Sequence, residues 1–259
     1  MSATYASHLS RLRDRGLLPG TVHAAYVAGS RVRGWDNAGS DLDFYVITQE
    51  RWPGSGSTIA PVALQPDTIT IERTRVNREQ WDVQYWLDSQ VDQVLEKVSW
   101  NEFETNASAG ALLTSREADF LERLSYAVAV TGEDWLLRRR QQMHRSALRS
   151  ILTSRSLHHS HLFSEDAVGQ LRAGDTESAV LSARLALGCA IQALLADNGK
   201  FAQSPKWSAR QLRETSQDVL SFDEYWALET MRDYSPDNPG RWIESVLSVC
   251  RRISQSVRV

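Results

Sequence analysis

The sequence predicts an α+β protein with a small sheet in its first half and an all-α helical bundle in its second half. Segments rich in β-branched and aromatic residues, bounded by Gly, Ser and Asn, recur between residues 22 and 87. From about residue 115 the apolar residues instead follow the helical period, with almost no strand pattern. This change of pattern predicts two domains, 1–135 and 136–259, which a chain of 259 residues can accommodate.

The first domain is expected to open with a helix and to continue as a sheet of about four or five strands. Leu9 and Leu12 share one face of a helix over residues 4–15, and Gly16 ends it. A Gly/Ser/Pro stretch at 53–57 separates the early strands from the later ones. The predicted strands are 22–28, 42–47, 68–75 and 81–87.

The second half reads as a series of helices separated by residues that interrupt helical backbone. Gly132, Gly199 and Pro205 stand at plausible corners between them, as does the run SPDNPG at 235–240. The helix that begins at residue 116 could pack on either domain, so the boundary is expected near 135 with a wide margin. The predicted helices are 116–131, 134–155, 176–197, 206–218, 221–233 and 239–257.

Composition and charge exclude several classes of protein. The 29 basic and 32 acidic side chains give a net charge of -3, so no bulk positive field exists to hold a nucleic acid. Cys189 and Cys250 lie far apart without metal-ligand spacing, which is typical of a reducing compartment. The first sixteen residues carry charges where a signal peptide is apolar, and Arg184 and Gln192 interrupt the longest apolar stretch. We expect a cytoplasmic protein without a membrane span.

The most specific feature is Gly29-Ser30, followed after ten residues by Asp41-Leu42-Asp43. The first strand ends at Gly29, where a turn without a side chain lets backbone amides approach a phosphate, and Ser30 adds a hydroxyl. Asp41 and Asp43 alternate along the second strand, so both carboxylates are expected on one face of the sheet. Hard oxygen ligands so close together suit Mg²⁺ that bridges substrate phosphates. The pattern predicts phosphoryl transfer.

A third carboxylate is expected on a neighbouring strand, and Asp82 within WDVQYW stands at such a position. With Asp41 and Asp43 it would hold two metal ions that activate an acceptor hydroxyl and neutralise the phosphates in an in-line displacement. Asp82 would act as general base or as a ligand that steers the acceptor. The alternative is an ordinary surface residue on an edge strand, because Asp88 and Asp92 lie close by, on the helix expected to follow.

Together these residues resemble the signature of the nucleotidyltransferase superfamily, which includes DNA polymerase β and the aminoglycoside nucleotidyltransferases. That signature is a Gly-Ser followed by a spaced Asp-x-Asp, as in VAGSRVRGWDNAGSDLDFYVI here. The resemblance implies a polymerase-β-like catalytic domain with a small mixed sheet, two Mg²⁺ ions and a nucleoside triphosphate donor. It also implies that Gly29, Ser30 and Ser40 lie at the nucleotide.

The helical half resembles the C-terminal domain of aminoglycoside and related small-molecule nucleotidyltransferases, through SARLALGCAIQALLADNG followed by SPKWSARQL. In that family a lysine of this domain reaches the triphosphate, which implies Lys206, one of only three lysines among 29 basic residues. A tyrosine further on contacts the nucleotide, which implies Tyr234. The chain departs from the commonest adenylyltransferase pattern in having Asp82 where Glu is usual, so the reach of the third carboxylate is one methylene shorter.

The resemblance implies an enzyme that moves a nucleoside monophosphate, AMP from ATP, to a hydroxyl of a small molecule and releases pyrophosphate. The acceptor would be an antibiotic such as an aminoglycoside, and the active site would lie in a cleft between the two domains. Two alternatives stay open at this point. The same chemistry could act on a protein or RNA partner, or the fold could serve as a non-catalytic nucleotide sensor.

Overall fold

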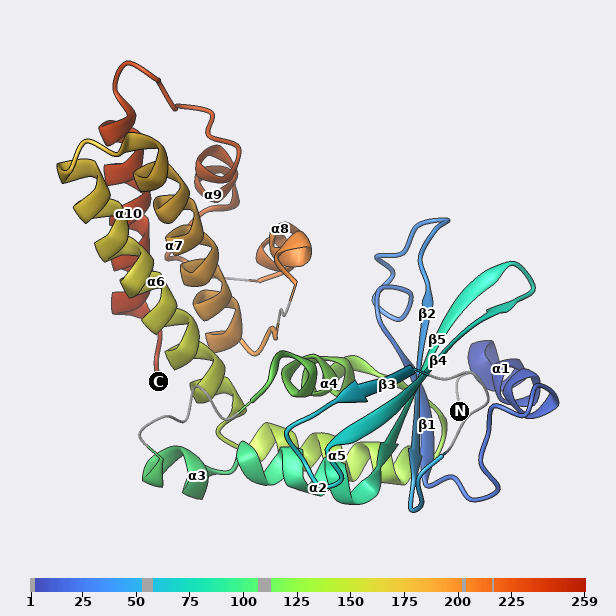
Figure 1. The fold of residues 1–259 in the computed structure, drawn as a ribbon. Helices are drawn as coiled ribbons and strands as arrows, with labels where there is room; N and C mark the ends of the chain where they lie inside the picture. The colour runs from blue at the N-terminus through green and yellow to red at the C-terminus, as the bar shows by residue number, and fades with distance from the viewer. Residues whose placement is uncertain (1–2, 53–57, 107–112, 202–203, 216) are drawn as a thin grey trace. The chain divides into compact units, whose positions relative to one another are not determined.

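In a computed structural model the chain forms two compact units, one up to Ser146 and one from Ala147 to Val259 (Figure 1). The division falls at Ser146 rather than near 135, because helix α5 (Glu133–Arg145) packs on elements of the first unit. The Gly/Ser/Pro stretch at 53–57 lies outside the described residues. Those residues are 3–52, 58–106, 113–201, 204–215 and 217–259.

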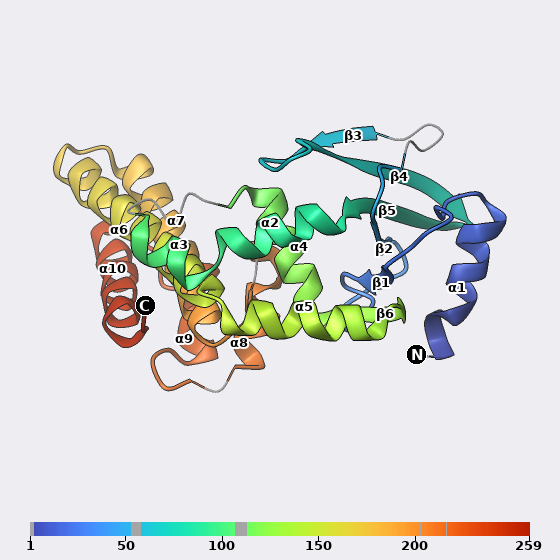
Figure 2. The ribbon, with the colours of Figure 1, turned by 90° about the horizontal axis from the view of Figure 1, so that it is seen from below.

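The described part of the first unit contains a six-stranded sheet in the order β3-β4-β5-β2-β1-β6 (Figures 1 and 2). The central strands β2 and β5 pair in parallel, and every other neighbouring pair is antiparallel. The predicted small mixed sheet is therefore confirmed, with more strands than expected. The strands are β1 (Ala24–Ala28), β2 (Leu42–Thr48), β3 (Thr58–Pro61), β4 (Thr68–Val76), β5 (Glu79–Leu87) and β6 (Val128–Thr131).

Strand β6 corrects the prediction of one helix over 116–131. Helix α4 (Ser115–Tyr126) ends earlier, and the next residues pair with β1 through Val27 and Val128. The segment VAVT is rich in β-branched residues, and the open edge of β1 offers it a row of hydrogen-bonding groups. Pairing with this edge outweighs the helical spacing of the sequence.

Helix α1 (Ala3–Asp14) covers one face of the sheet. Its Leu12 is fully buried in a cluster with Phe44, Val46 and Trp81, which point from β2 and β5 to this face. Because side chains alternate along a strand, the residues between these point to the opposite face.

Helices α4 and α5 cover that opposite face with aromatic side chains. The stacked rings of Tyr26 and Tyr45 lie 5.1 Å apart, Phe120 of α4 meets Tyr45 edge-on, and Trp135 of α5 lies beside Tyr26. Asp43 stands two residues before Tyr45 on β2, so it points to the same face as α4. The position of α4 therefore determines what Asp43 meets.

A buried carboxylate anchors the start of α4. The side chain of Glu117 is fully buried and accepts hydrogen bonds from the backbone amides of Thr114 and Ala63, and from Lys97 of helix α2 (Asp88–Lys97). The bond to Thr114 closes a capping box at the helix N-terminus. Glu117 thus joins α4 to α2 and to the chain that follows β3.

We expect Glu117→Ala to destabilise the first unit by about 3–5 kcal/mol, because it leaves the ammonium of Lys97 without its anionic partner and two amides without their acceptor. Urea denaturation followed by circular dichroism measures the change. The control is Glu104→Ala on the exposed surface of helix α3 (Trp100–Thr105), which should stay within about 0.5 kcal/mol. A loss of stability at Glu117 no larger than at Glu104 would contradict the anchoring role.

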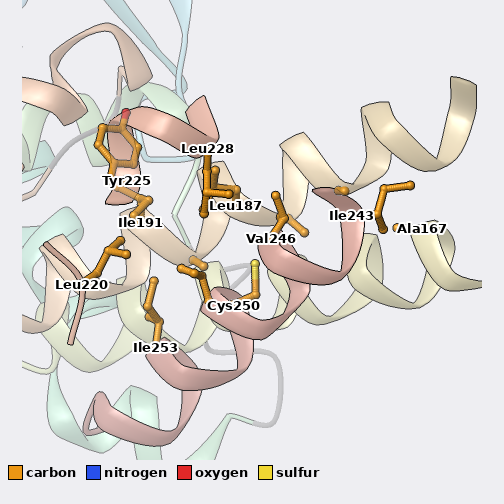
Figure 3. Close-up of a cluster of buried hydrophobic side chains, with 14 of the residues drawn as sticks. Ala167, Leu187, Ile191, Leu220, Tyr225, Leu228, Ile243, Val246, Cys250 and Ile253 are labelled. Carbon is orange, nitrogen blue, oxygen red and sulfur yellow. The ribbon is translucent and has the colours of Figure 1, made fainter. Parts of the chain in front are cut away.

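The second unit is a bundle of helices, as the sequence predicted. Helix α6 (Leu148–Arg172) pairs with α7 (Thr176–Asp197), and α10 (Pro239–Ser256) packs against α7. Figure 3 shows the cluster of buried side chains between them, among them Leu187, Ile191, Val246, Cys250 and Ile253. The smaller helices are α8 (Ser208–Arg213) and α9 (Phe222–Glu229), with a 3-10 turn over Pro205–Trp207.

Three helix predictions in this half needed correction, one of them because the helix expected over 221–233 ends at Glu229 as α9. The helix expected over 134–155 is two helices, α5 and α6, separated at Ser146–Ala147. The helix expected over 206–218 is only the short turn at Pro205–Trp207 followed by α8. For the helix expected over 134–155, a continuous helical pattern in the sequence spans a corner, Ser146–Ala147, that contains neither Gly nor Pro.

Helix α7 is long and apolar enough, by length and composition, to cross a membrane. In this structure 67% of its most apolar stretch is buried within the protein. The buried side chains contact α6 and α10, as expected of the central helix of a bundle.

Candidate functional site

The central strands β2 and β5 bring the predicted acidic residues together at the end of the sheet where β1 ends and β2 begins, and we call Asp41, Asp43 and Asp82 the acidic edge. Asp43 on β2 stands opposite Ala28 of β1 on one side and opposite Asp82 of β5 on the other. Residues that pair directly across strands point to the same face, so Asp43 and Asp82 are side-chain neighbours. Their side chains are 22% and 23% exposed, which leaves both within reach of a ligand.

Asp41 is placed differently from the expectation. It lies just before β2, which begins at Leu42, and its side chain is exposed. Its charge still acts on Asp43: burial raises the pKa of Asp43, Arg123 opposes the rise, and the charges of Asp119, Asp82 and Asp41 add to it. The site is therefore a concentration of negative charge with one dominant cationic partner.

Gly29 lies against the acidic pair at the end of β1. Its φ is +84°, and a Cβ at this position would lie 1.9 Å from Oδ2 of Asp43 and 2.9 Å from Nη1 of Arg123. A residue with a side chain would meet both steric overlap and a strained backbone. The sequence motif thus has a structural cause: only glycine lets the turn approach the carboxylate.

The loop from Ser30 to Asp41 is held by its own hydrogen bonds. The carbonyl of Ser30 accepts from the amides of Arg33 and Trp35, and the hydroxyl of Ser40 accepts from the amide of Asn37. Arg31 donates to the carbonyl of Ser40 at 2.8 Å and to Glu79 at the start of β5. These contacts place Ser30 and Ser40 at the two ends of a braced loop; their role in binding a nucleotide stays a prediction.

Helix α4 braces the same loop from outside. The guanidinium of Arg33 lies 3.8 Å from the ring centroid of Trp35 and 4.4 Å from that of Tyr126. It also forms an ion pair with Glu122 at 3.4 Å. Cation-π contacts on two rings combined with a nearly buried carboxylate fix the loop firmly to α4.

Arg123, also on α4, contacts the candidate site directly. Its Nη1 donates to Oδ2 of Asp43 at 2.9 Å, and its Nε donates to Asp119 one turn earlier at 3.3 Å. The sequence did not indicate this residue, since it stands far from the motif in the chain and belongs to no recognisable spacing. Asp82 has a weaker partner, Arg73, at 3.4 Å, whose side chain is 67% exposed.

The donor atoms of the acidic edge fit Mg²⁺ by their chemistry, because carboxylate oxygens are its preferred protein ligands. In the arrangement seen here, Oδ2 of Asp43 is engaged by Arg123. Across the described segments, no three His, Cys, Asp or Glu side chains gather closely enough to hold a metal ion. Metal binding by Asp41, Asp43 and Asp82 stays a prediction.

Lys206 and Tyr234 belong to the helical unit. Lys206 is exposed on the 3-10 turn, with its Nζ 5.2 Å from the ring centroid of Trp207. Tyr234 packs edge-on against Trp242 of α10. Their expected contacts with a nucleotide stay predictions.

A cavity of about 470 Å³ opens in the helical unit, with Pro205 and Ser208 in its lining. Leu181 and Leu185 on α7 contribute apolar side chains that are 60% and 52% exposed, and Tyr225 of α9 also lines it. The ion pair between Arg184 and Glu229 adds charge to the lining. Apolar walls with a few polar groups are typical of small-molecule sites.

Comparison with known proteins bears on the fold. No protein-family model matches the chain, and no curated protein matches its sequence. Among solved structures it is similar to a nucleotidyltransferase-like protein from Exiguobacterium sibiricum, with a TM-score of 0.52 and 15% identity. The match covers 98% of this chain and 75% of that one. The fold is therefore α+β and nucleotidyltransferase-like, as the motif implied.

Proposed function

We propose that this chain is a nucleotidyltransferase that moves AMP from ATP to a hydroxyl of a small molecule and releases pyrophosphate. The observation that carries the proposal is the pairing of Asp43 and Asp82 on adjacent strands, with Gly29 against Asp43 at the end of β1, within a nucleotidyltransferase-like fold. Carboxylates that lie beside a glycine turn at the end of a strand suit a metal-bound triphosphate.

In this mechanism the chain's own residues bind the phosphates, orient the acceptor hydroxyl and accept its proton. The backbone at Gly29 and the hydroxyl of Ser30 approach the phosphates. Asp82 accepts the proton of the acceptor hydroxyl, or orients that hydroxyl for attack. Mg²⁺, two ions when fully bound, would be held by Asp41, Asp43 and Asp82, and would neutralise charge on the α-phosphate and the leaving pyrophosphate.

The helical unit would supply the remaining contacts of the donor and acceptor. Lys206 would meet the triphosphate and Tyr234 the nucleotide, as the family resemblance implies. The cavity of the helical unit, which is lined by the exposed side chains of Leu181 and Leu185, suits a ring system of a small molecule. A net charge of -3 favours a cationic small molecule, such as an aminoglycoside, over a nucleic acid.

The test is pyrophosphate release with each of the four nucleoside triphosphates, with and without Mg²⁺, in the presence of a panel of aminoglycosides. We expect one donor, ATP, to give Mg²⁺-dependent release with a hydroxyl-bearing acceptor. Asp82→Asn should lower the rate by about 10²-fold or more, the usual contribution of a general base. Asp92→Asn, an exposed carboxylate that pairs with Arg139 on another part of the unit, is the matched control and should keep the wild-type rate.

Two outcomes favour the alternatives. Radioactive label from ATP that appears on proteins or RNA of a lysate, and on no small molecule, would indicate a macromolecular acceptor. A Mg²⁺-dependent rise in melting temperature with one triphosphate, without any pyrophosphate release, would indicate a nucleotide sensor. Absence of both binding and release would contradict the proposal.

A further inference from the structure

The ion pair between Arg123 and Asp43 is the strongest interaction made by any carboxylate of the acidic edge. Nη1 of Arg123 lies 2.9 Å from Oδ2 of Asp43, against 3.4 Å for the pair of Arg73 and Asp82. Both members of the first pair are about three-quarters buried, whereas Arg73 is largely exposed. Because a partly buried charge pair is screened less than an exposed one, Arg123 holds Asp43 more firmly than Arg73 holds Asp82.

The oxygen that Arg123 contacts, Oδ2 of Asp43, is also a candidate ligand for a divalent cation. The guanidinium places a permanent positive charge at Oδ2 of Asp43, and arginine does not lose that charge at neutral pH. A cation that approaches this oxygen must displace the guanidinium or bind against its repulsion. The contact also lies directly against Gly29, where a Cβ would be 2.9 Å from Nη1 of Arg123.

Arg123 has a second carboxylate within reach on its own helix. Asp119 lies one turn earlier and accepts from Nε of Arg123 at 3.3 Å. Its side chain is more exposed than that of Asp43. Arg123 can therefore leave Asp43 and still keep one anionic partner, Asp119.

We propose that Arg123 is a resident cation of this site, which competes with divalent metal for Asp43 and retains Asp119 as its partner when the metal binds. The inference deepens the proposed function, on which it rests for the role of the acidic edge. It makes Arg123 a positioning residue that sets the apparent metal affinity.

The experiment measures Mn²⁺ binding in the absence of nucleotide, by the electron paramagnetic resonance signal of free Mn²⁺. We expect Arg123→Gln to lower the Kd for Mn²⁺ by at least about tenfold, because it removes a unit charge from the ligand oxygen. Arg123→Lys, which keeps the charge, should stay close to the wild type. Arg139→Gln is the matched control, since Arg139 also bridges two aspartates, Asp88 and Asp92, and should leave Mn²⁺ binding unchanged.

A Kd for Arg123→Gln within twofold of the wild type, or an equal gain in Arg139→Gln, would overturn the inference. If Arg123→Gln does not fold, as judged by circular dichroism, Asp119→Asn gives a second test. It leaves Arg123 with Asp43 alone, so Mn²⁺ should bind at least about threefold more weakly than to the wild type. Wild-type affinity in Asp119→Asn would then overturn the inference.

This titration involves neither nucleotide nor turnover, so it separates the two ideas. Tighter Mn²⁺ binding by Arg123→Gln, with no pyrophosphate release by any form of the protein, would support the resident cation and contradict the proposed transfer. Pyrophosphate release by the wild type, with unchanged Mn²⁺ binding in the variant, would support the transfer and contradict the resident cation.

Discussion

Asp43→Asn is expected to lower the rate of nucleotide transfer by about 10³-fold or more, equivalent to about 4 kcal/mol of transition-state stabilisation. The asparagine keeps the size of the side chain but loses the charge that a divalent cation requires. Asp43 is also the central member of the acidic edge, between Ala28 and Asp82 in the register of the sheet. Pyrophosphate release under saturating ATP and Mg²⁺ measures the effect.

The same substitution should leave the fold intact, which makes the loss of activity interpretable. Burial raises the pKa of Asp43, so the folded protein already accommodates a neutral group at this position better than an isolated charge. Arg123 retains Asp119 as a partner. We therefore expect a change in unfolding free energy within about 1 kcal/mol. Full activity in a folded Asp43→Asn protein would contradict the catalytic assignment.

Gly29→Ala is expected to be the most damaging small substitution at the site. The new Cβ would have to displace Oδ2 of Asp43 and Nη1 of Arg123, and the backbone at φ +84° disfavours any side chain. The backbone strain alone costs about 1–2 kcal/mol, and the loss of the Arg123–Asp43 contact adds to it. We expect a total loss of about 3 kcal/mol in unfolding free energy, together with loss of nucleotide transfer.

Gly34→Ala provides a matched control within the same loop. Gly34 also has a positive φ, +66°, but a Cβ there would meet nothing within 4 Å. This variant should therefore carry only the backbone cost of about 1–2 kcal/mol and keep the acidic edge in place. Urea denaturation of both variants separates the cost of backbone strain from the cost of the steric overlap at Gly29. Equal destabilisation of the two would show that the approach of Gly29 to Asp43 is of no consequence.

Much of the first unit could be predicted because its signals are local. The strands around Gly29 and Asp43 are short, dense in β-formers and separated by a polar loop, and the structure has strands at Ala24–Ala28 and Leu42–Thr48. Asp82 could be predicted to lie on a strand because the alternation of WDVQYW is typical of one. The structure places it on β5, directly opposite Asp43. The boundaries were less predictable, and Asp41 lies just outside β2.

The residues that sequence reasoning missed act across long distances in the chain. Arg123 reaches Asp43 only because α4 packs on the same face of the sheet, and a helix pattern does not reveal which of its charged residues faces a strand. Strand β6 could not be predicted from its own sequence, because it forms by pairing with the open edge of β1. The sequence does not distinguish Arg33 from the other basic residues, because its contacts with the rings of Trp35 and Tyr126 form only in the folded protein.

The order of strands has a consequence for how the protein is made on the ribosome. Residues 42–48 and 79–87 must meet in parallel at the centre of the sheet, and its β1 edge is completed only when Val128–Thr131 has emerged. Such non-local pairing is slow compared with the closure of helices that are neighbours in sequence. The α6–α7 hairpin needs only the short turn after Arg172. We expect the nascent first unit to expose an unfinished β-edge during translation, which makes synthesis the stage at which this protein most needs protection from aggregation.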